Sequence, residues 1–167
     1  VDLHAARERG IAVSYTPEAP SPAVAELTLG LIFSLLRHTQ VANLRMHRGE
    51  WHRHTGQRLS AVTVGLIGVG RIGSRVANML LSLGVQRLLV NDTAPRGVTS
   101  EGNNLHWVDK ETMYNEADVI SLHVPLTQQT NNMIAEQQLR QMKPLATLIN
   151  TSRGGVVNED HLLTTFL

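Results

Sequence analysis

Short apolar runs alternate with segments of helical periodicity from about residue 59 to the end of the chain. Each run is apolar over nearly its whole length, which is typical of strands in a parallel sheet that helices cover on both faces. The segments between them carry apolar residues on one face, as amphipathic helices do. The pattern therefore predicts an α/β fold with a doubly wound parallel sheet. The expected strands are Val62 to Ile67, Arg87 to Asn91, Leu105 to Val108, Val119 to Val124 and Leu145 to Asn150, and the expected helices between them are Ile72 to Leu83, Asp109 to about Asn115 and Ala135 to Met142.

The first 58 residues have a different pattern. A short helix from Asp2 to Arg9, ended by Gly10, and a short strand from Ile11 to Tyr15 precede a proline-rich connector. Ser21 as a candidate N-cap and Pro22 at the first helical position then predict the start of one long helix that runs to about Met46. The first half of this helix is apolar nearly all round, so it must be covered on several sides. We therefore expect a homodimer that pairs through the long helix near 21–46.

Both ends of the chain suggest a piece of a longer protein. The sequence begins with Val1 rather than with methionine and a basic, apolar leader. Near the other end, Asn158 is a candidate helix cap with Glu159 and Asp160 behind it, and the helix that they begin has no closing cap before Leu167. We expect a domain that is incomplete at its C-terminus.

Composition narrows the classes of protein that fit. The 167 residues hold 15 Lys and Arg, 14 Asp and Glu and no cysteine, so disulfide scaffolds and Cys-rich zinc folds are excluded. A formal net charge of +1 gives no long-range attraction for nucleic acid or anionic lipid. The longest apolar stretch, 23–36, contains Glu26 and is shorter than the roughly 20 residues of a membrane span. We expect a cytoplasmic domain without nucleic-acid or membrane partners.

The segment from Gly68 to Gly73 is the strongest chemical motif. It has the pattern G-x-G-x-x-G and lies between a predicted strand and a predicted helix, which is the context that a dinucleotide-binding turn requires. Gly68 allows the tight turn, Gly70 lets the backbone approach a pyrophosphate, and Gly73 lets helix and strand pack closely. The amides of Arg71 and Ile72 then face the phosphates from the positive end of the helix dipole.

Asp92 ends the second predicted strand, 19 residues after the last of these glycines. An acid at this place accepts hydrogen bonds from the adenosine ribose and repels a 2′-phosphate, which favours NAD over NADP. Arg96 is the one nearby residue that could soften the exclusion of NADP. The alternative is that the glycines only form a tight turn and Asp92 only caps a strand.

Several ordered segments resemble one family, the D-isomer-specific 2-hydroxyacid dehydrogenases. The resemblance covers nearly the whole chain, and three of the segments match the family's signatures closely. The signature segments are Gly65 to Gly73, His123 to Thr127 with Thr130, and Ile149 to Gly155 with Asn158 and Glu159; weaker matches are Val1 to Leu3, Arg9 to Ile11, Val24 to Glu26 and Gly49 to Trp51.

This resemblance implies a fold and an activity. The fold would be a Rossmann-type coenzyme domain over residues 17–167, with residues 1–16 as a linker from a preceding substrate domain. The activity would be hydride transfer between NAD(H) and a small D-2-hydroxy or 2-oxo acid. An alternative within the same family is an NAD(H)-sensing corepressor without catalysis, because the residues seen here would fit such a protein too.

The resemblance also implies roles for single residues. Arg153 corresponds to the arginine that holds the carboxylate and keto oxygen of the substrate, a task suited to a guanidinium fork; the alternative is an ordinary surface ion pair. The other expected contacts are Arg71 and Ile72 for the pyrophosphate, Asp92 for the ribose, Val124 and Pro125 beside the adenosine half, and Thr151 and Ser152 near the nicotinamide.

Two parts of the family's catalytic machinery are not matched. The family uses a histidine for the hydroxyl proton and a glutamate that raises the pKa of this histidine, both farther downstream of the arginine than this chain extends. Glu159 and His161 do not match that motif, and His123 would serve binding at most. His52 and His54 lack a third ligand, so we predict no metal site. We expect the chain to bind coenzyme and not to turn over substrate alone.

Overall fold

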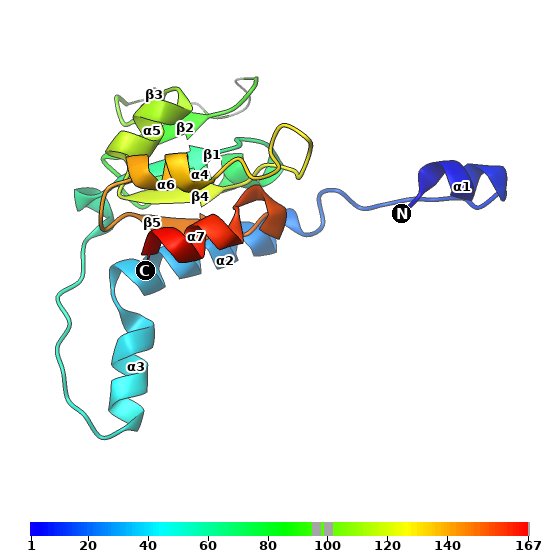
Figure 1. Ribbon diagram of the computed structural model, residues 1–167. Helices are drawn as coiled ribbons and strands as arrows, with labels where there is room; N and C mark the ends of the chain where they lie inside the picture. The colour runs from blue at the N-terminus through cyan, green and yellow to red at the C-terminus, as the bar shows by residue number, and fades with distance from the viewer. Residues whose placement is uncertain (95–97, 99–101, 167) are drawn as a thin grey trace.

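A five-stranded parallel sheet forms the centre of the computed structural model, which describes residues 1–94, 98 and 102–166 (Figure 1). The strand order is β3-β2-β1-β4-β5, so the chain moves outward from β1 in one direction and then returns to continue on the other side. The predicted doubly wound α/β fold is confirmed. The strands are β1 (Thr63–Ile67), β2 (Arg87–Asn91), β3 (Leu105–Trp107), β4 (Val119–Leu122) and β5 (Thr147–Asn150).

The register aligns the carboxyl ends of the central strands. Ile67 at the end of β1 is paired with Asn91 at the end of β2 and with Leu122 at the end of β4. Leu122 is in turn paired with Asn150 at the end of β5. The loops that follow these strands therefore meet at one edge of the sheet. The strand order reverses between β1 and β4, which is where open α/β sheets bind ligands.

Helices cover both faces of the sheet (Figure 1). One buried cluster joins α2 and α4 to side chains such as Val64 and Leu66, and the other joins α5 and α6 to side chains such as Leu89 and Ile120. Alternate residues of each strand point to opposite faces, so both clusters draw on the same strands. The helices are α1 (Leu3–Glu8), α2 (Ser21–Leu36), α3 (Thr39–His47), α4 (Arg71–Ser82), α5 (Lys110–Glu116), α6 (Glu136–Gln141) and α7 (Glu159–Phe166), with short 3-10 turns η1 (Leu59–Ala61) and η2 (Gly154–Val156).

Local capping explains why most helix ends lie close to the predicted positions. The carboxylate of Asp2 accepts hydrogen bonds from two amides of α1, and that of Asp109 accepts one from the amide of Thr112 at 2.7 Å. Gly10 and Gly84 follow α1 and α4 with φ of 65° and 82°, a conformation that favours glycine. The side chain of Asn158 accepts a hydrogen bond from the amide of His161 at 2.9 Å.

The prediction of one long helix over 21–46 is wrong. The helix α2 ends at Leu36, His38 adopts a left-handed conformation with φ of 54°, and α3 then leads away from the sheet (Figure 1). The carbonyl of Leu36 accepts a hydrogen bond from the amide of Gln57 at 2.9 Å, in place of the next turn of helix. Within α3, all of which the structure describes, no side chain is buried, so packing gives no reason to extend α2.

Two smaller predictions at the N-terminus are also wrong. Residues 11–15 form no strand, because they run between α1 and the body of the protein beside no described strand with which they could pair (Figure 1). Ser21 does not cap α2; it is the first residue of the helix, and its hydroxyl donates to the carbonyl of Pro17 at 3.5 Å. Pro20 holds the cap position instead.

Candidate functional site

The three motif glycines have three different surroundings after β1. Gly68 has a φ of 92°, and a Cβ there would lie 2.7 Å from the carbonyl oxygen of His123. A Cβ on Gly73 would lie 2.0 Å from the carbonyl oxygen of Gly68. A Cβ on Gly70 would meet no atom within 4 Å. Two of the glycines therefore hold the turn against its neighbours, and the third leaves its backbone open to an approaching ligand.

The helix α4 begins directly after this turn, with Gly70 at its cap position. Amides in the first turn of a helix have no carbonyl partner within the helix, and the aligned peptide dipoles add positive charge there. The amides of Arg71 and Ile72 are therefore placed to bind an anion. The side chain of Arg71 points to the connector before α2, where its guanidinium pairs with the carboxylate of Glu18.

Asp92 links the end of β2 to the glycine turn. One carboxylate oxygen accepts a hydrogen bond from the amide of Val69 at 2.6 Å, and the other accepts bonds from the amide of Ala94 and the hydroxyl of Thr93, both at 3.2 Å. Partial burial alone would raise the pKa of Asp92, but these hydrogen bonds together lower it below its ordinary value. The carboxylate is therefore charged at neutral pH. Arg96, the residue that could soften the exclusion of NADP, lies outside the described residues.

Two cavities open side by side at the carboxyl edge of the sheet, and His123, Val124 and Pro125 line both of them. A cavity of about 270 Å³ has the glycine turn and Asp92 in its wall. A cavity of about 540 Å³ has the start of α4 and the turn after β5 in its wall. The predicted residues divide between them as follows: Gly68, Gly70 and Asp92 line the smaller cavity, Ile72, Thr151, Ser152 and Arg153 line the larger, and Gly73 lies buried behind the turn.

The turn after β5 is shaped by Asn150 and anchored by Thr28. The side chain of Asn150 donates to the carbonyl of Arg153 at 2.8 Å and accepts from the amide of Ser152 at 3.0 Å. The hydroxyl of Thr28, a fully buried residue of α2, donates to the carbonyl of Val24 at 2.8 Å and lies 3.1 Å from the hydroxyl of Thr151. The turn that carries Arg153 is therefore hydrogen-bonded to α2.

Arg153 is exposed at the rim of the larger cavity, and one of its guanidinium nitrogens donates to the carbonyl of Ser152 at 2.8 Å. Within residues 1–94, 98 and 102–166, no carboxylate lies within ion-pair distance of Arg153. This observation gives no support to the alternative that Arg153 serves an ordinary surface ion pair. The guanidinium can donate hydrogen bonds to a carboxylate of a ligand.

His123 lies between the two cavities with little exposure. Its Nε2 atom is 3.0 Å from the hydroxyl of Ser121, which is fully buried. Burial lowers the pKa of His123 to about 4, so its ring is neutral at pH 7. A neutral, largely covered ring can fill space and accept or donate one hydrogen bond, but with this lowered pKa it does not readily take up a proton near neutral pH.

Several residues that line these cavities were not predicted from the sequence, among them Lys110, Pro20 and Val24. Lys110, at the start of α5, lines the smaller cavity with Asp92, and Pro20 and Val24 from the N-terminal part line the larger one. A signal for Lys110 existed, because it follows the carboxyl end of β3 by only a few residues. No local signal marks Pro20 or Val24, since the packing of α2 brings them to the site.

The described residues contain no group of three or more His, Cys, Asp or Glu side chains that could hold a metal ion. The rings of His52 and His54 have their centroids 4.6 Å apart, and His38 lies 5.8 Å from His54, without a carboxylate among them. In the same part of the chain, none of the helices is long and apolar enough to cross a membrane.

Comparison with known proteins gives a consistent result. The family model described as "D-isomer specific 2-hydroxyacid dehydrogenase, NAD binding domain" matches residues 29–166. A hydroxypyruvate reductase of Thermotoga maritima is 37% identical over 164 residues, which cover 97% of this chain and 52% of the relative. A glyoxylate reductase of Thermofilum pendens is 38% identical over 169 residues, with coverage of 98% and 50%. The chain thus spans about half the length of these curated relatives.

A similar solved structure has the same architecture. The crystal structure of a D-lactate dehydrogenase from Aquifex aeolicus, complexed with NAD and lactic acid, superposes with a TM-score of 0.86 at 34% identity. The match covers 99% of this chain and 50% of that one.

Proposed function

Because this chain belongs to the D-isomer-specific 2-hydroxyacid dehydrogenase family, matching its NAD-binding domain, we propose that it binds NAD(H) at the carboxyl edge of the sheet. We propose further that the whole protein transfers a hydride between this coenzyme and a small D-2-hydroxy or 2-oxo acid. The observation that carries the proposal is the glycine turn, where an open Gly70 lies next to the charged Asp92. A dinucleotide needs this combination, because its pyrophosphate approaches backbone and its ribose donates to an acid.

The geometry suggests how the chain would hold NAD(H). The amides of Arg71 and Ile72 would bind the pyrophosphate at the positive end of α4, and Asp92 would accept hydrogen bonds from the adenosine ribose. Val124 and Pro125 line both cavities, so they suit the wall beside the adenosine half. The bound coenzyme supplies a hydride donor or acceptor at its nicotinamide ring. Thr151 and Ser152, in the wall of the larger cavity, would face that ring.

Arg153 would bind the carboxylate of the substrate. It lies in the wall of the same cavity as Thr151 and Ser152, and a guanidinium binds a carboxylate through two parallel hydrogen bonds. Asn150 holds the carbonyl of Arg153, and Thr28 holds the hydroxyl of Thr151, so the side chain starts from a fixed backbone. The role of Arg153 is therefore to orient the acid beside the nicotinamide.

The chain spans about half of its curated relatives, so turnover is a proposal for the whole protein. We propose that residues 1–16 link a substrate domain to a coenzyme domain over 17–167. Ile11, Val13 and Tyr15 are 57%, 46% and 82% exposed, which suits a segment that packs on another domain. The full-length protein should oxidise NADH with at least one member of a panel of 2-oxo acids. Saturable NADH binding without oxidation by any of these acids would contradict the proposed reaction.

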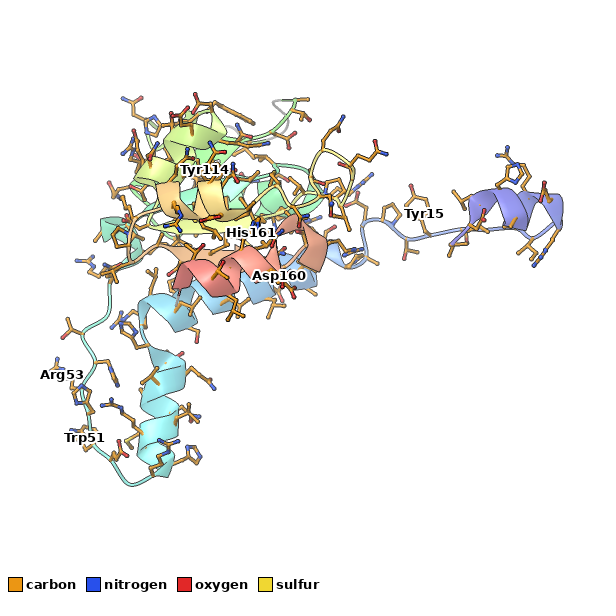
Figure 2. All side chains as sticks on the ribbon, in the orientation of Figure 1. Tyr15, Trp51, Arg53, Tyr114, Asp160 and His161 are labelled. Carbon is orange, nitrogen blue, oxygen red and sulfur yellow. The ribbon has the colours of Figure 1, made fainter. Side chains whose placement is uncertain are left out.

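Replacement of Asp92 by alanine should weaken NADH binding by about tenfold, because the ribose loses a charged hydrogen-bond acceptor. The unmodified chain should bind NADH more tightly than NADPH, and Asp92→Ala should reduce this preference, since the repulsion of a 2′-phosphate disappears. Fluorescence titrations with both coenzymes measure the two effects. Asp160→Ala is the matched control, because Asp160 lies on α7 (Figure 2) and does not line either of the two cavities. Failure of the unmodified chain to bind either coenzyme would contradict the proposed function.

The alternative of an NAD(H)-sensing corepressor is not supported, since the relatives and the structure compared above are reductases and dehydrogenases. A cytoplasmic location stays a prediction. So does the homodimer, for which the support is that α2 and α3 expose apolar side chains, among them Leu27, Leu35 and Leu44. Light scattering that shows only an 18.4 kDa species at micromolar concentration would contradict the dimer.

A further inference from the structure

Glu18 and Arg71 form an ion pair at the mouth of the proposed coenzyme site. Arg71 is the first residue of α4, and its neighbour Ile72 lines the larger cavity. Glu18 lies in the connector before α2, two residues ahead of Pro20, which lines the same cavity. The pair therefore joins two segments that both border the place where an anion would meet the start of α4.

The backbone around Glu18 is held in position. The amide of Ser21 donates to the carbonyl of Glu18 at 3.1 Å, and the hydroxyl of Ser21 donates to the carbonyl of Pro17 at 3.5 Å. The connector also contains Pro17 and Pro20, whose φ angles are restricted. Behind it, α2 and α4 share one buried cluster, which contains Ile32 and Val76. These contacts hold the backbone of Glu18 close to the start of α4.

The ion pair with Glu18 offsets the unfavourable position of the Arg71 cation at the start of α4. A cation at the start of a helix is repelled by the positive end of the helix dipole, and Arg75 adds a second cation one turn later. The carboxylate of Glu18 compensates this charge when no ligand is present. The side chains of Arg71 and Glu18 are 61% and 62% exposed, so water screens their attraction and the guanidinium can exchange partners readily.

We propose that Glu18 competes with the coenzyme pyrophosphate for the guanidinium of Arg71 and thereby weakens coenzyme binding. This inference rests on the proposed function, because it concerns the same site. A pyrophosphate at the start of α4 would bind the guanidinium of Arg71, which Glu18 otherwise pairs with. Once the guanidinium has turned to the pyrophosphate, the carboxylate of Glu18 remains beside the two negative charges of the pyrophosphate. The chain then carries an internal anion that favours release of the coenzyme, a step that limits turnover in many enzymes.

The test is a set of NADH titrations at low and high ionic strength, with inorganic pyrophosphate as a second probe. Glu18→Gln keeps the shape and removes the charge, and it should tighten NADH binding about threefold at low salt. The gain should vanish at high salt, where exposed charges are screened. Glu136→Gln is the matched control, because Glu136 is also an exposed partner of an arginine but lies on α6, and it should leave binding unchanged.

Two further variants decide whether the effect acts through Arg71. Arg71→Ala should weaken binding of both probes, and adding Glu18→Gln to Arg71→Ala should give a smaller gain than in the unmodified chain, because only the direct repulsion between Glu18 and the phosphates is then removed. Unchanged or weaker binding by Glu18→Gln would overturn the inference, and so would an equal gain in the Arg71→Ala background. The chain could also bind pyrophosphate, with the expected effect of Glu18→Gln, and fail to bind NADH. That result would support the inference and contradict the proposed function. A chain that binds neither probe contradicts both.

Discussion

Replacing Gly73 by alanine should destabilise the chain by about 3 kcal/mol, although alanine is the better helix former. Gly73 lies inside α4, and its new Cβ would stand 2.0 Å from the carbonyl oxygen of Gly68. That oxygen belongs to the backbone of a turn whose φ of 92° leaves little freedom. Either α4 moves away from β1 or the turn opens, and both movements loosen buried packing. Urea unfolding followed by circular dichroism measures the loss.

Gly70→Ala is the matched comparison, because it makes the same chemical change three residues earlier. A Cβ on Gly70 meets no atom within 4 Å, so this variant should lose much less stability than Gly73→Ala, only the small cost of alanine at a helix cap. It should nevertheless bind NADH more weakly, because the methyl group occupies the space through which a pyrophosphate approaches the backbone. If Gly73→Ala and Gly70→Ala were equally stable, the assignment of Gly73 to close packing and of Gly70 to ligand approach would be contradicted.

Lowering the pH from 7 to 5 should reduce the free energy of unfolding by about 2 kcal/mol through His123 alone. Burial lowers the pKa of His123 to about 4, whereas an unfolded histidine titrates near its ordinary value of 6.5. Between these two values the unfolded state binds more protons than the folded state, so stability rises with pH. The contribution is therefore present above about pH 6.5 and is lost as the pH falls toward 4.

The slope of stability against pH isolates this effect from any general damage. His123→Gln should flatten the curve between pH 7 and 5, even if the variant is less stable throughout. His54 acts in the same direction, because desolvation, with help from His52, Arg45 and His38, lowers its pKa. A separate His54→Gln variant measures how much of the pH dependence of stability comes from His54. If His123→Gln retains the full slope, the buried ring is not its source.

The sequence was a good guide where the cause of a structure is local. The glycine turn could be predicted because the spacing of Gly68, Gly70 and Gly73 and the flanking apolar runs lie within one short segment. The start of α5 at Asp109 could be predicted because the hydrogen bond from the amide of Thr112 reaches only three residues along the chain. In these places neighbouring residues decide the backbone conformation.

Prediction failed where the cause lies elsewhere in the chain. The break after α2 depends on the amide of Gln57, which comes back to the carbonyl of Leu36 from a distant part of the sequence. The expected strand near Val13 has suitable residues but no described neighbour to pair with. At the site, the pairing of Arg71 with Glu18 and the hydroxyl contact of Thr151 with α2 depend on how α2 packs. No pattern within a short window contains that information.

The carboxylate of Asp92 has an evolutionary consequence. One of its oxygens holds the amide of Val69 at 2.6 Å, so the same side chain that would select the coenzyme also fastens the glycine turn to β2. A substitution that removes this carboxylate to admit a 2′-phosphate would therefore leave the amide of Val69 without its acceptor. A lineage that changes coenzyme preference must first, or simultaneously, acquire another acceptor for the Val69 amide. Coenzyme choice in this fold is thus harder to change than a single surface charge would suggest.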